Sequence, residues 1–360
     1  MENKEEIENN DKEKKILNDD ISKPDTPGFF TLSYKNGDTF SGQLTKGSIN
    51  LFGIYHQSNG ITFEGDFSKQ LNTTKEKDNK IKGKLTFDNG QSIYEGEFLN
   101  GKFDGKGTLY SSNGDIYEGD FKNGLKDGQG IFLFAEGDKY IGSFSNNNFD
   151  GEGKLIIKDI SDYIGKFKNG QYEGYGILKS LINNDILIGV FKNGKINGEG
   201  FQILSNGDRY DGYFKKGKFD GKGIYKFENG DIYEGNFVDG YFEGVGEIKY
   251  EIGDKYKGQF LKGEKCGKGI LYFGDKNIYE GDFLNDKFHG EGVLFKSNGD
   301  MIEGHFENGL IKGKATFYPN NGTPYDINTE EDLDEENIEE KESSNVEEST
   351  QENSKSVIEH

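Results

Sequence analysis

The sequence is poor in the residues that most often define an active site, a secreted protein or a membrane span. Its 360 residues include a single cysteine, Cys266, so no disulfide framework can form. Tryptophan is absent, and Arg209 is the only arginine, the residue best suited to bind phosphate through two parallel hydrogen bonds. No apolar run approaches the roughly 18 residues of a membrane-spanning helix, and the N-terminus has no apolar signal segment. We therefore expect a cytoplasmic protein.

Aromatic residues are missing from both ends of the chain. All 20 tyrosines and 29 phenylalanines lie between Phe29 and Tyr325. Residues 1–28 carry nine acids and five lysines, residues 328–360 carry thirteen acids and two lysines, and together they hold most of the net charge of −21. Segments with so few apolar side chains cannot bury a core. We expect disordered polar tails there, flanking one repeat array at 29–327.

Glycine, by contrast, is abundant, and it recurs with a fixed period. An aromatic slot, represented by Tyr117 in the run DIYEGDF, occurs thirteen times, and ten of the twelve intervals are 23 residues long. Glycine lies two residues past the slot in twelve copies, and phenylalanine lies four residues past it in eleven. One interval of 31 residues contains an insertion, for which we expect a loop at about 68–80. The slots are Phe40, Phe63, Tyr94, Tyr117, Tyr140, Tyr163, Leu187, Tyr210, Tyr233, Tyr256, Tyr279, Ile302 and Tyr325. Such a period is typical of a repeat protein.

Each repeat has the pattern of two β-strands. In DIYEGDF the side chains of Tyr117 and Phe121 alternate with polar ones, which predicts a half-buried strand. A second run, such as GIFLF at 130–134, follows a Gly-x-Gly pair that we assign to a turn. Asn-Gly-Asp at 113–115 supplies the other turn. The strand glycine leaves room for a ring of the neighbouring strand to lie across the backbone. The expected fold is all-β, an elongated single-sheet array of antiparallel β-hairpins.

The acids before each Gly-x-Gly pair invite comparison with a metal or phosphate site, and neither fits. A dinucleotide-binding Gly-x-Gly needs a third glycine and a following helix, whereas strands follow here. The acids recur about 10 Å apart, too far for neighbours to share a calcium ion. They are Asp104, Asp127, Asp150, Glu173, Asp220 and Glu243, and other copies hold Asn197, Cys266, His289 and Lys312. This pattern indicates a polar turn position, so we expect no metal and no cofactor.

The sequence also offers no catalytic group. Cys266 and His289 are one repeat apart, too distant for the hydrogen bond that activates a nucleophile. The other three histidines follow no pattern with a possible partner residue. The polar tails are too short to hold a catalytic core of their own. We therefore expect a protein that is not an enzyme.

The repeated unit YEGDFKNGLKDGQGIFLF closely resembles the MORN repeat, whose pattern is roughly Tyr-Glu-Gly-Glu-Trp, Asn-Gly, His-Gly-x-Gly and an aromatic strand. The resemblance covers about 29–325 and implies an array of about twelve repeats. Here phenylalanine replaces the tryptophan of the family, and acids mostly replace the basic residues before the glycine pair. MORN arrays usually serve as scaffolds that place other proteins at membranes, the cortical cytoskeleton, basal bodies or axonemes.

The resemblance implies a scaffold that binds a helix or an extended peptide of a partner protein along an aromatic groove, at a cytoskeletal, ciliary or cortical structure. Homodimers through the array ends are a further expectation. The alternative is a phosphoinositide-binding module that tethers a membrane or regulates a lipid kinase; the acidic charge makes lipid binding weak or indirect. We expect no nucleic-acid partner. The aromatic stripe, with a structural or partner-binding role, is Tyr94, Phe98, Tyr117, Phe121, Tyr140, Phe144, Tyr163, Phe167, Tyr210, Phe214, Tyr233, Phe237, Tyr256, Phe260, Tyr279 and Phe283.

Overall fold

A computed structural model describes residues 28–45, 48–67 and 80–329 of the chain. Regular structure in these residues consists of β-strands and one short 3-10 turn, η2 (Asp88–Gly90). The prediction of an all-β chain of antiparallel hairpins is therefore confirmed. Within the described part, no helix has the length and apolar character that a membrane crossing requires.

The chain forms two compact units, which share the same architecture. Among the described residues, the first comprises those from 28 to 136 with 145–147, and the second comprises 137–144 with 148–329. The first unit contains β1 (Gly28–Ser33), β2 (Thr39–Thr45), β3 (Ser48–His56), β4 (Thr62–Asp66), β5 (Ile81–Phe87), β6 (Ser92–Leu99), β7 (Lys102–Tyr110), β8 (Ile116–Lys122) and β9 (Leu125–Leu133). The second contains β10 (Lys139–Ser145), β11 (Asn148–Ile157), β12 (Ser161–Lys168), β13 (Gln171–Ser180), β14 (Ile186–Lys192), β15 (Lys195–Ile203), β16 (Arg209–Lys215), β17 (Lys218–Lys226), β18 (Ile232–Val238), β19 (Tyr241–Lys249), β20 (Lys255–Leu261), β21 (Glu264–Tyr272), β22 (Ile278–Leu284), β23 (Lys287–Phe295), β24 (Met301–Glu307), β25 (Leu310–Tyr318) and β26 (Tyr325–Asn328).

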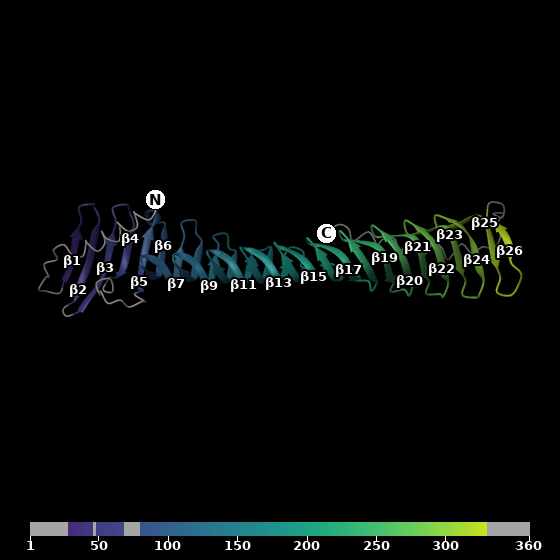
Figure 1. Ribbon diagram of the computed structural model, residues 1–360, viewed down its shortest axis with the longest axis horizontal. Helices are drawn as coiled ribbons and strands as arrows, with labels where there is room; N and C mark the ends of the chain where they lie inside the picture. The colour runs from purple at the N-terminus through teal and green to yellow at the C-terminus, as the bar shows by residue number, and fades with distance from the viewer. Residues whose placement is uncertain (1–27, 46–47, 68–79, 330–360) are drawn as a thin grey trace. The chain divides into compact units, whose positions relative to one another are not determined.

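Within each unit, a strand pairs antiparallel with the strand that follows it in the chain, so neighbours in sequence are neighbours in space (Figure 1). The register places glycine opposite glycine: Gly119 of β8 faces Gly107 of β7 and Gly130 of β9. On the same face, Tyr117 lies opposite Leu109 and Phe132. The period of the sequence thus becomes a row of glycines beside a row of aromatic rings.

The Gly-x-Gly pair lies inside a strand rather than in a turn, which corrects our assignment. Strand β9 begins at Leu125 and includes Gly128 and Gly130. Gly128 has a φ of 118°. It lies at a β-bulge, where the register between β8 and β9 shifts. Gly130 lies under the ring of Tyr117, where an added Cβ would be 2.5 Å from a ring carbon. One glycine therefore permits the bulge, and the other permits the close approach of the ring.

Two kinds of turn join the strands. Asn123 and Gly124 both have positive φ, 51° and 87°, as a tight two-residue hairpin turn requires. At the opposite edge, the Gly114 N–H donates to the Ser111 carbonyl at 2.9 Å, and Gly114 has a φ of 90°. The turn predicted at Asn-Gly-Asp 113–115 is therefore confirmed.

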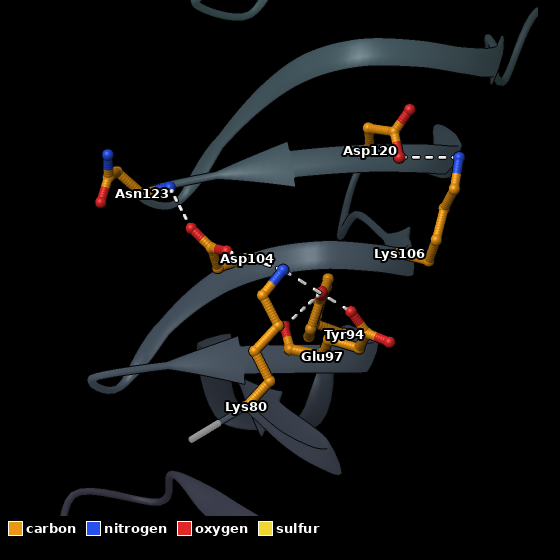
Figure 2. Close-up of polar contacts among 7 residues, drawn as sticks. All are labelled: Lys80, Tyr94, Glu97, Asp104, Lys106, Asp120 and Asn123. Carbon is orange, nitrogen blue, oxygen red and sulfur yellow. Dashed lines mark hydrogen bonds and ion pairs between the residues drawn. The ribbon is translucent and has the colours of Figure 1, made fainter. Parts of the chain in front are cut away.

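The acids before each glycine pair connect one repeat to the next. Asp104 of β7 accepts a hydrogen bond from the Asn123 N–H at 3.2 Å and forms an ion pair with Lys80 at 3.0 Å (Figure 2). Asn197 accepts the same bond from the Lys216 N–H through its amide oxygen. The position thus lies within a strand, not in a turn, and in these two repeats an acceptor oxygen makes the bond with or without a charge.

A second series of acids has the same role at the other edge. Asp115 accepts a hydrogen bond from the Ala135 N–H at 2.9 Å, and Asp208 accepts one from the Glu228 N–H at 2.7 Å. In both cases the acceptor is in one turn and the donor is in the turn of the following repeat. Much of the acidity of the repeats therefore serves to join neighbouring hairpins.

Some expectations fall on residues that the structure does not describe. The two disordered tails, expected at 1–28 and 328–360, lie outside the described residues except for Gly28 at the start of β1 and Asn328 and Thr329 at the end of the array. The insertion loop at about 68–80 lies outside them except for its last residue. The elongated shape of the array and dimerisation through its ends stay predictions.

Candidate functional site

The sixteen side chains of the aromatic stripe are all buried, none exposing more than 4% of its surface. Tyr233 of β18 illustrates why. Its ring stacks on Phe242 of β19 with centroids 3.7 Å apart, and Phe237 and Phe260 meet it edge-on at 5.3 and 5.1 Å. Stacked and edge-on contacts are the favoured geometries of aromatic pairs. The rings thus cover one another and form the core of a single-layer sheet.

The tyrosine hydroxyls of the stripe are also satisfied inside the fold. Each donates to a backbone carbonyl three residues later, as Tyr117 does to Asp120 at 2.9 Å and Tyr233 to Asn236 at 3.0 Å. Burial raises the pKa of the Tyr140 phenol to about 12, so the ring stays neutral at physiological pH. The burial fits the structural role that we expected for the stripe. The partner-binding role needs exposed rings, which these sixteen residues do not offer.

The opposite face of the sheet carries an apolar patch in the second unit. Strand register defines it, because directly paired residues point to the same face. Its central row runs through Ile164, Ile177, Ile188 and Phe201, each paired with the next across β12 to β15. The outer rows contain Ile186, Ile203, Tyr175, Val190 and Tyr213. We call these nine residues the apolar patch.

The patch is open to solvent. Ile164 exposes 51% of its surface, Tyr175 64% and Tyr213 45%, while Ile188 and Phe201 are half-buried between their neighbours. Five strands spaced about 4.8 Å apart, with three rows of side chains, span roughly 300–400 Å². The largest contiguous apolar patch of a typical soluble monomer is about 300–600 Å², and such a patch is often functional. The patch is therefore the candidate site for contact with another molecule.

The sequence contains a signal for this patch that our prediction missed. The residue after the aromatic slot is acidic in eight of the thirteen copies, as in Glu118 and Glu234. It is isoleucine in three consecutive repeats, at Ile141, Ile164 and Ile188. The motif YEG thus becomes YIG, YIG and LIG. Because this residue points away from the aromatic core, the change adds nothing to the core and instead makes the opposite face apolar.

Charged side chains surround the patch unevenly. At the β11–β12 side, Lys154 pairs with Asp162 at 3.1 Å and Lys166 with Glu152 at 3.9 Å. At the β15–β16 side, Glu199 and Asp211 are exposed. Among the described residues, neither of these two carboxylates has a basic side chain within ion-pair distance. The charges are thus paired at one end of the patch and unpaired at the other.

The same face is also hollowed over β19 to β24. This open groove is lined by alternating charges and small apolar groups, among them Lys257, Lys268, Glu280 and Glu291. Lys268 already pairs with Asp282 at 2.9 Å. The groove lacks the continuous apolar surface found over β12 to β16, so we regard the patch as the stronger site.

The residues with catalytic potential do not form a site. Cys266 lies opposite Gln259, and His289 lies opposite Asp282 in a different strand pair. Burial raises the pKa of the Cys266 thiol, which disfavours the reactive thiolate. No group of three His, Cys, Asp or Glu side chains among the described residues could hold a metal ion.

Known structures and curated proteins give little further guidance. The chain has 15% identity to the TCP domain of Drosophila melanogaster SAS-4 in complex with a proline-rich motif of Ana2, over 57% of this chain and 86% of that one, with a TM-score of 0.19. It has 15% identity to a streptogramin B lyase, over 83% and 87% of the two chains, with a TM-score of 0.14. TM-scores this low do not show that the chain shares a fold with either protein. No curated protein matches the chain.

The repeats themselves match a known family. The family model of the MORN repeat matches ten segments between residues 94 and 323, which together cover more than half of the chain. Our estimate was about twelve repeats. The hairpins that begin at Phe40 and Phe63 follow the same strand and glycine pattern but lie outside the matched segments. The matched segments follow one another along the chain and coincide with its paired strands, so the chain belongs to the MORN repeat family.

Proposed function

We propose that this protein is a non-enzymatic scaffold that binds a partner protein through the apolar patch. The observation that carries the proposal is the apolar patch on β12 to β16, on the face opposite the core, where five of the nine side chains are exposed and the other four are half-buried. Exposed apolar rows on a regular sheet are costly unless a partner covers them, because they favour non-specific association. The buried aromatic stripe has the complementary role of holding that face rigid.

The sheet offers a pre-formed surface for a helix or an extended peptide. Side chains of the central row stand one strand apart, at about 4.8 Å, and the rows are about 7 Å apart along the strands. A partner segment of a few apolar residues can contact several rows at once. Since each strand of the patch, β12 to β16, is already paired on both sides, apolar side chains rather than backbone bonds supply the contact.

We place the protein in the cytoplasm, at a cytoskeletal, ciliary or cortical structure. This part of the proposal is supported by the MORN repeats and by the single cysteine of the sequence. Fluorescence microscopy of the tagged protein in its source cell tests it. A diffuse signal that is fully extracted by mild detergent would argue against attachment to such a structure.

The binding role is tested by proximity labelling with matched variants. The double substitution Ile177→Glu and Ile188→Glu places two carboxylates in the central row, and we expect the set of labelled proteins to shrink. Phe295→Glu is the control, because Phe295 is exposed to a similar extent, 38% against 40% for Ile177, and lies on the same face outside the patch. Purified candidates should then bind the wild-type protein at least tenfold more tightly than the double variant. Equal labelling by all three proteins would contradict the proposal.

Lipid binding, the alternative function, has less support from the structure. The patch has unpaired carboxylates at its margin, and anionic lipids repel them. Flotation with phosphoinositide-containing vesicles at low salt separates the two functions. We expect the protein to stay with the soluble fraction, and flotation that is abolished by the patch substitutions would favour the lipid function instead.

A further inference from the structure

We infer that the segment bound at the apolar patch combines aliphatic residues with a basic side chain, and that the basic side chain lies over the β15–β16 end. This inference rests on the proposed function, since it assigns the chemistry of the partner at the same patch. Its evidence is a group of four side chains, Glu199 and Phe201 on β15 and Asp211 and Tyr213 on β16. We call this group the acidic–aromatic quartet.

The quartet alternates charge and ring. Glu199 pairs directly with Tyr213, and Phe201 pairs directly with Asp211. The two carboxylates are therefore diagonal to each other, as are the two rings, all on the face opposite the core. A lysine or arginine placed at the centre would meet a carboxylate on two sides and a ring on the other two. Cations bind favourably to both, through charge attraction and through the face of an aromatic ring.

The quartet differs from the rest of the patch margin in its charge balance. The acids at the β11–β12 end are already neutralised, Asp162 by Lys154 and Glu152 by Lys166. Within the described residues, Glu199 and Asp211 have no such partner. Arg209, paired with Ile203, and Lys226, paired with Arg209, lie on the same face beside the quartet, and neither forms an ion pair with Asp211. Charge complementarity therefore sets an orientation, with the basic end of the segment towards β16 and its aliphatic end towards β12.

A second copy of this chain fits the patch poorly. The patch spans roughly 300–400 Å², whereas a stable interface buries about 800 Å² on each partner. The chain also carries a net charge of −21, so two copies repel each other while a basic partner is attracted. The area and the charge both favour a short basic segment of another protein.

The test uses a phage-displayed library of random 12-residue peptides as the probe. The full chain is the bait, and the Ile177→Glu/Ile188→Glu variant serves for counter-selection. We expect the enriched peptides to contain two or more aliphatic residues beside an arginine or lysine. Synthetic versions should lose at least tenfold in affinity when the basic residue is replaced by glutamate, and their binding should weaken with added salt.

The reversal variant Glu199→Lys/Asp211→Lys separates the inference from the proposed function. It should bind the basic peptides at least tenfold more weakly and should enrich acidic peptides in a second selection. Glu280→Lys, an exposed acid on the same face outside the patch, is the control and should behave as wild type. Circular dichroism and thermal melts confirm that each variant is folded.

Each outcome decides one point. Enriched peptides that are aliphatic but lack a basic residue would overturn the inference and leave the proposed function in place. Equal enrichment by the wild-type chain and the Ile177→Glu/Ile188→Glu variant would overturn both. Self-association that the same substitutions abolish would make a second copy the occupant and would also overturn the inference.

Discussion

At the scale of single residues, the two glycines of each Gly-x-Gly pair have different physical roles. The first adopts a left-handed backbone at a β-bulge, as Gly128 does with a φ of 118°. The second has no side chain because the ring of a tyrosine occupies that space, as Tyr117 does over Gly130. The pair therefore recurs because each repeat bends a strand and buries a ring at the same place.

The substitution Gly130→Ala tests the second role. A Cβ there would lie 2.5 Å from a carbon of the Tyr117 ring, so the ring must move and the protein should lose about 1–3 kcal/mol of unfolding free energy. Denaturant melts measure the loss. Gly124→Ala is the control. No heavy atom lies within 4 Å of a Cβ added at Gly124, so the only cost of alanine there is the strain of a left-handed backbone. A larger loss at Gly124 than at Gly130 would show that backbone strain, not ring contact, selects the glycine.

The acid series provides a prediction about pH. Burial would raise the pKa of the Asp104 carboxyl, but the ion pair with Lys80 and the Asn123 N–H hold it below its usual value (Figure 2). A lowered pKa in the folded state stabilises the protein above the unfolded pKa, near 4, and the stabilisation disappears as the pH falls through the folded value. Loss of these contacts should therefore contribute to unfolding in acid.

We predict that Asp104→Ala costs about 1 kcal/mol at pH 7, because it removes an acceptor from the Asn123 N–H. Asp104→Asn should cost less, since Asn197 makes the same bond in another repeat. Denaturant melts at pH 7 and pH 3 test both variants. The difference between wild type and the asparagine variant should be smaller at pH 3 than at pH 7, because pH 3 lies below the unfolded pKa of the carboxyl. A difference that is the same at both pH values would mean that the Asp104 charge does not contribute.

At the scale of the hairpin, two repeats replace the stacked ring by a lysine, Lys126 over Tyr117 and Lys265 over Tyr256. Phe242 stacks on Tyr233 in its repeat, whereas the equivalent residue in the next repeat is the buried Lys265. Its ammonium group lies 3.5 Å from Asp286 and over the ring of Tyr256. Asp286 also accepts a hydrogen bond from the Lys265 N–H, and it occupies a turn position that is usually glycine. The two departures from the repeat pattern thus compensate for each other.

We predict that the double substitution Lys265→Phe/Asp286→Gly, which restores the usual repeat, is at least as stable as wild type. Replacing a buried ion pair by apolar groups is often neutral or stabilising. Lys265→Phe alone should be less stable than the double variant, because Asp286 then keeps a strained backbone and an unpaired carboxylate. Thermal melts of the variants measure this coupling.

Lys268→Phe is the control for this cycle. Lys268 lies on the same strand, but it is exposed, and exposed ion pairs contribute little to stability. Its effect should be small and independent of the Asp286→Gly substitution. If the single and double variants at Lys265 were equally stable, the two positions would be independent of each other.

At the scale of the whole molecule, the contacts among the described residues link neighbouring repeats. Phe237 meets the rings of Tyr210, Phe219, Tyr233 and Phe242, all from its own repeat or the one before it. The hydrogen bonds of the two acid series also reach only the following repeat. In such an array, stability is close to a sum of repeat and neighbour contributions. Damage in one repeat should therefore stay local.

Phe237→Ala tests this locality. Removing a buried phenylalanine costs about 3–5 kcal/mol, and Phe237 exposes only 1% of its surface. Hydrogen exchange should show lost protection at about 210–280, while 94–140 and 279–320 stay protected. Val238→Ala is the control, because the neighbouring Val238 is 48% exposed. A uniform loss of protection would show that the array unfolds as one unit.

The period of the sequence by itself determined the fold class. Tyr117, Gly119 and Phe121 alternate with polar residues, and this alternation together with Asn-Gly turns allows little besides antiparallel hairpins. The regular step of 23 residues also placed the aromatic side chains in one stripe, because identical repeats put equivalent residues on the same face. Local patterns of this kind are visible in sequence because the interactions that they specify are close in the chain.

Only the tertiary structure decided which face can meet a partner. The sequence shows that Tyr163 and Ile164 point to opposite faces, but it does not show which face is covered. In the structure the rings cover one another, so the aromatic face is buried and the isoleucine face is open. The pairing of Phe201 with Asp211 and of Glu199 with Tyr213 also depends on register, which a β-bulge can shift by one residue. Burial and register arise from contacts between strands, and single residues in a linear pattern do not reveal them.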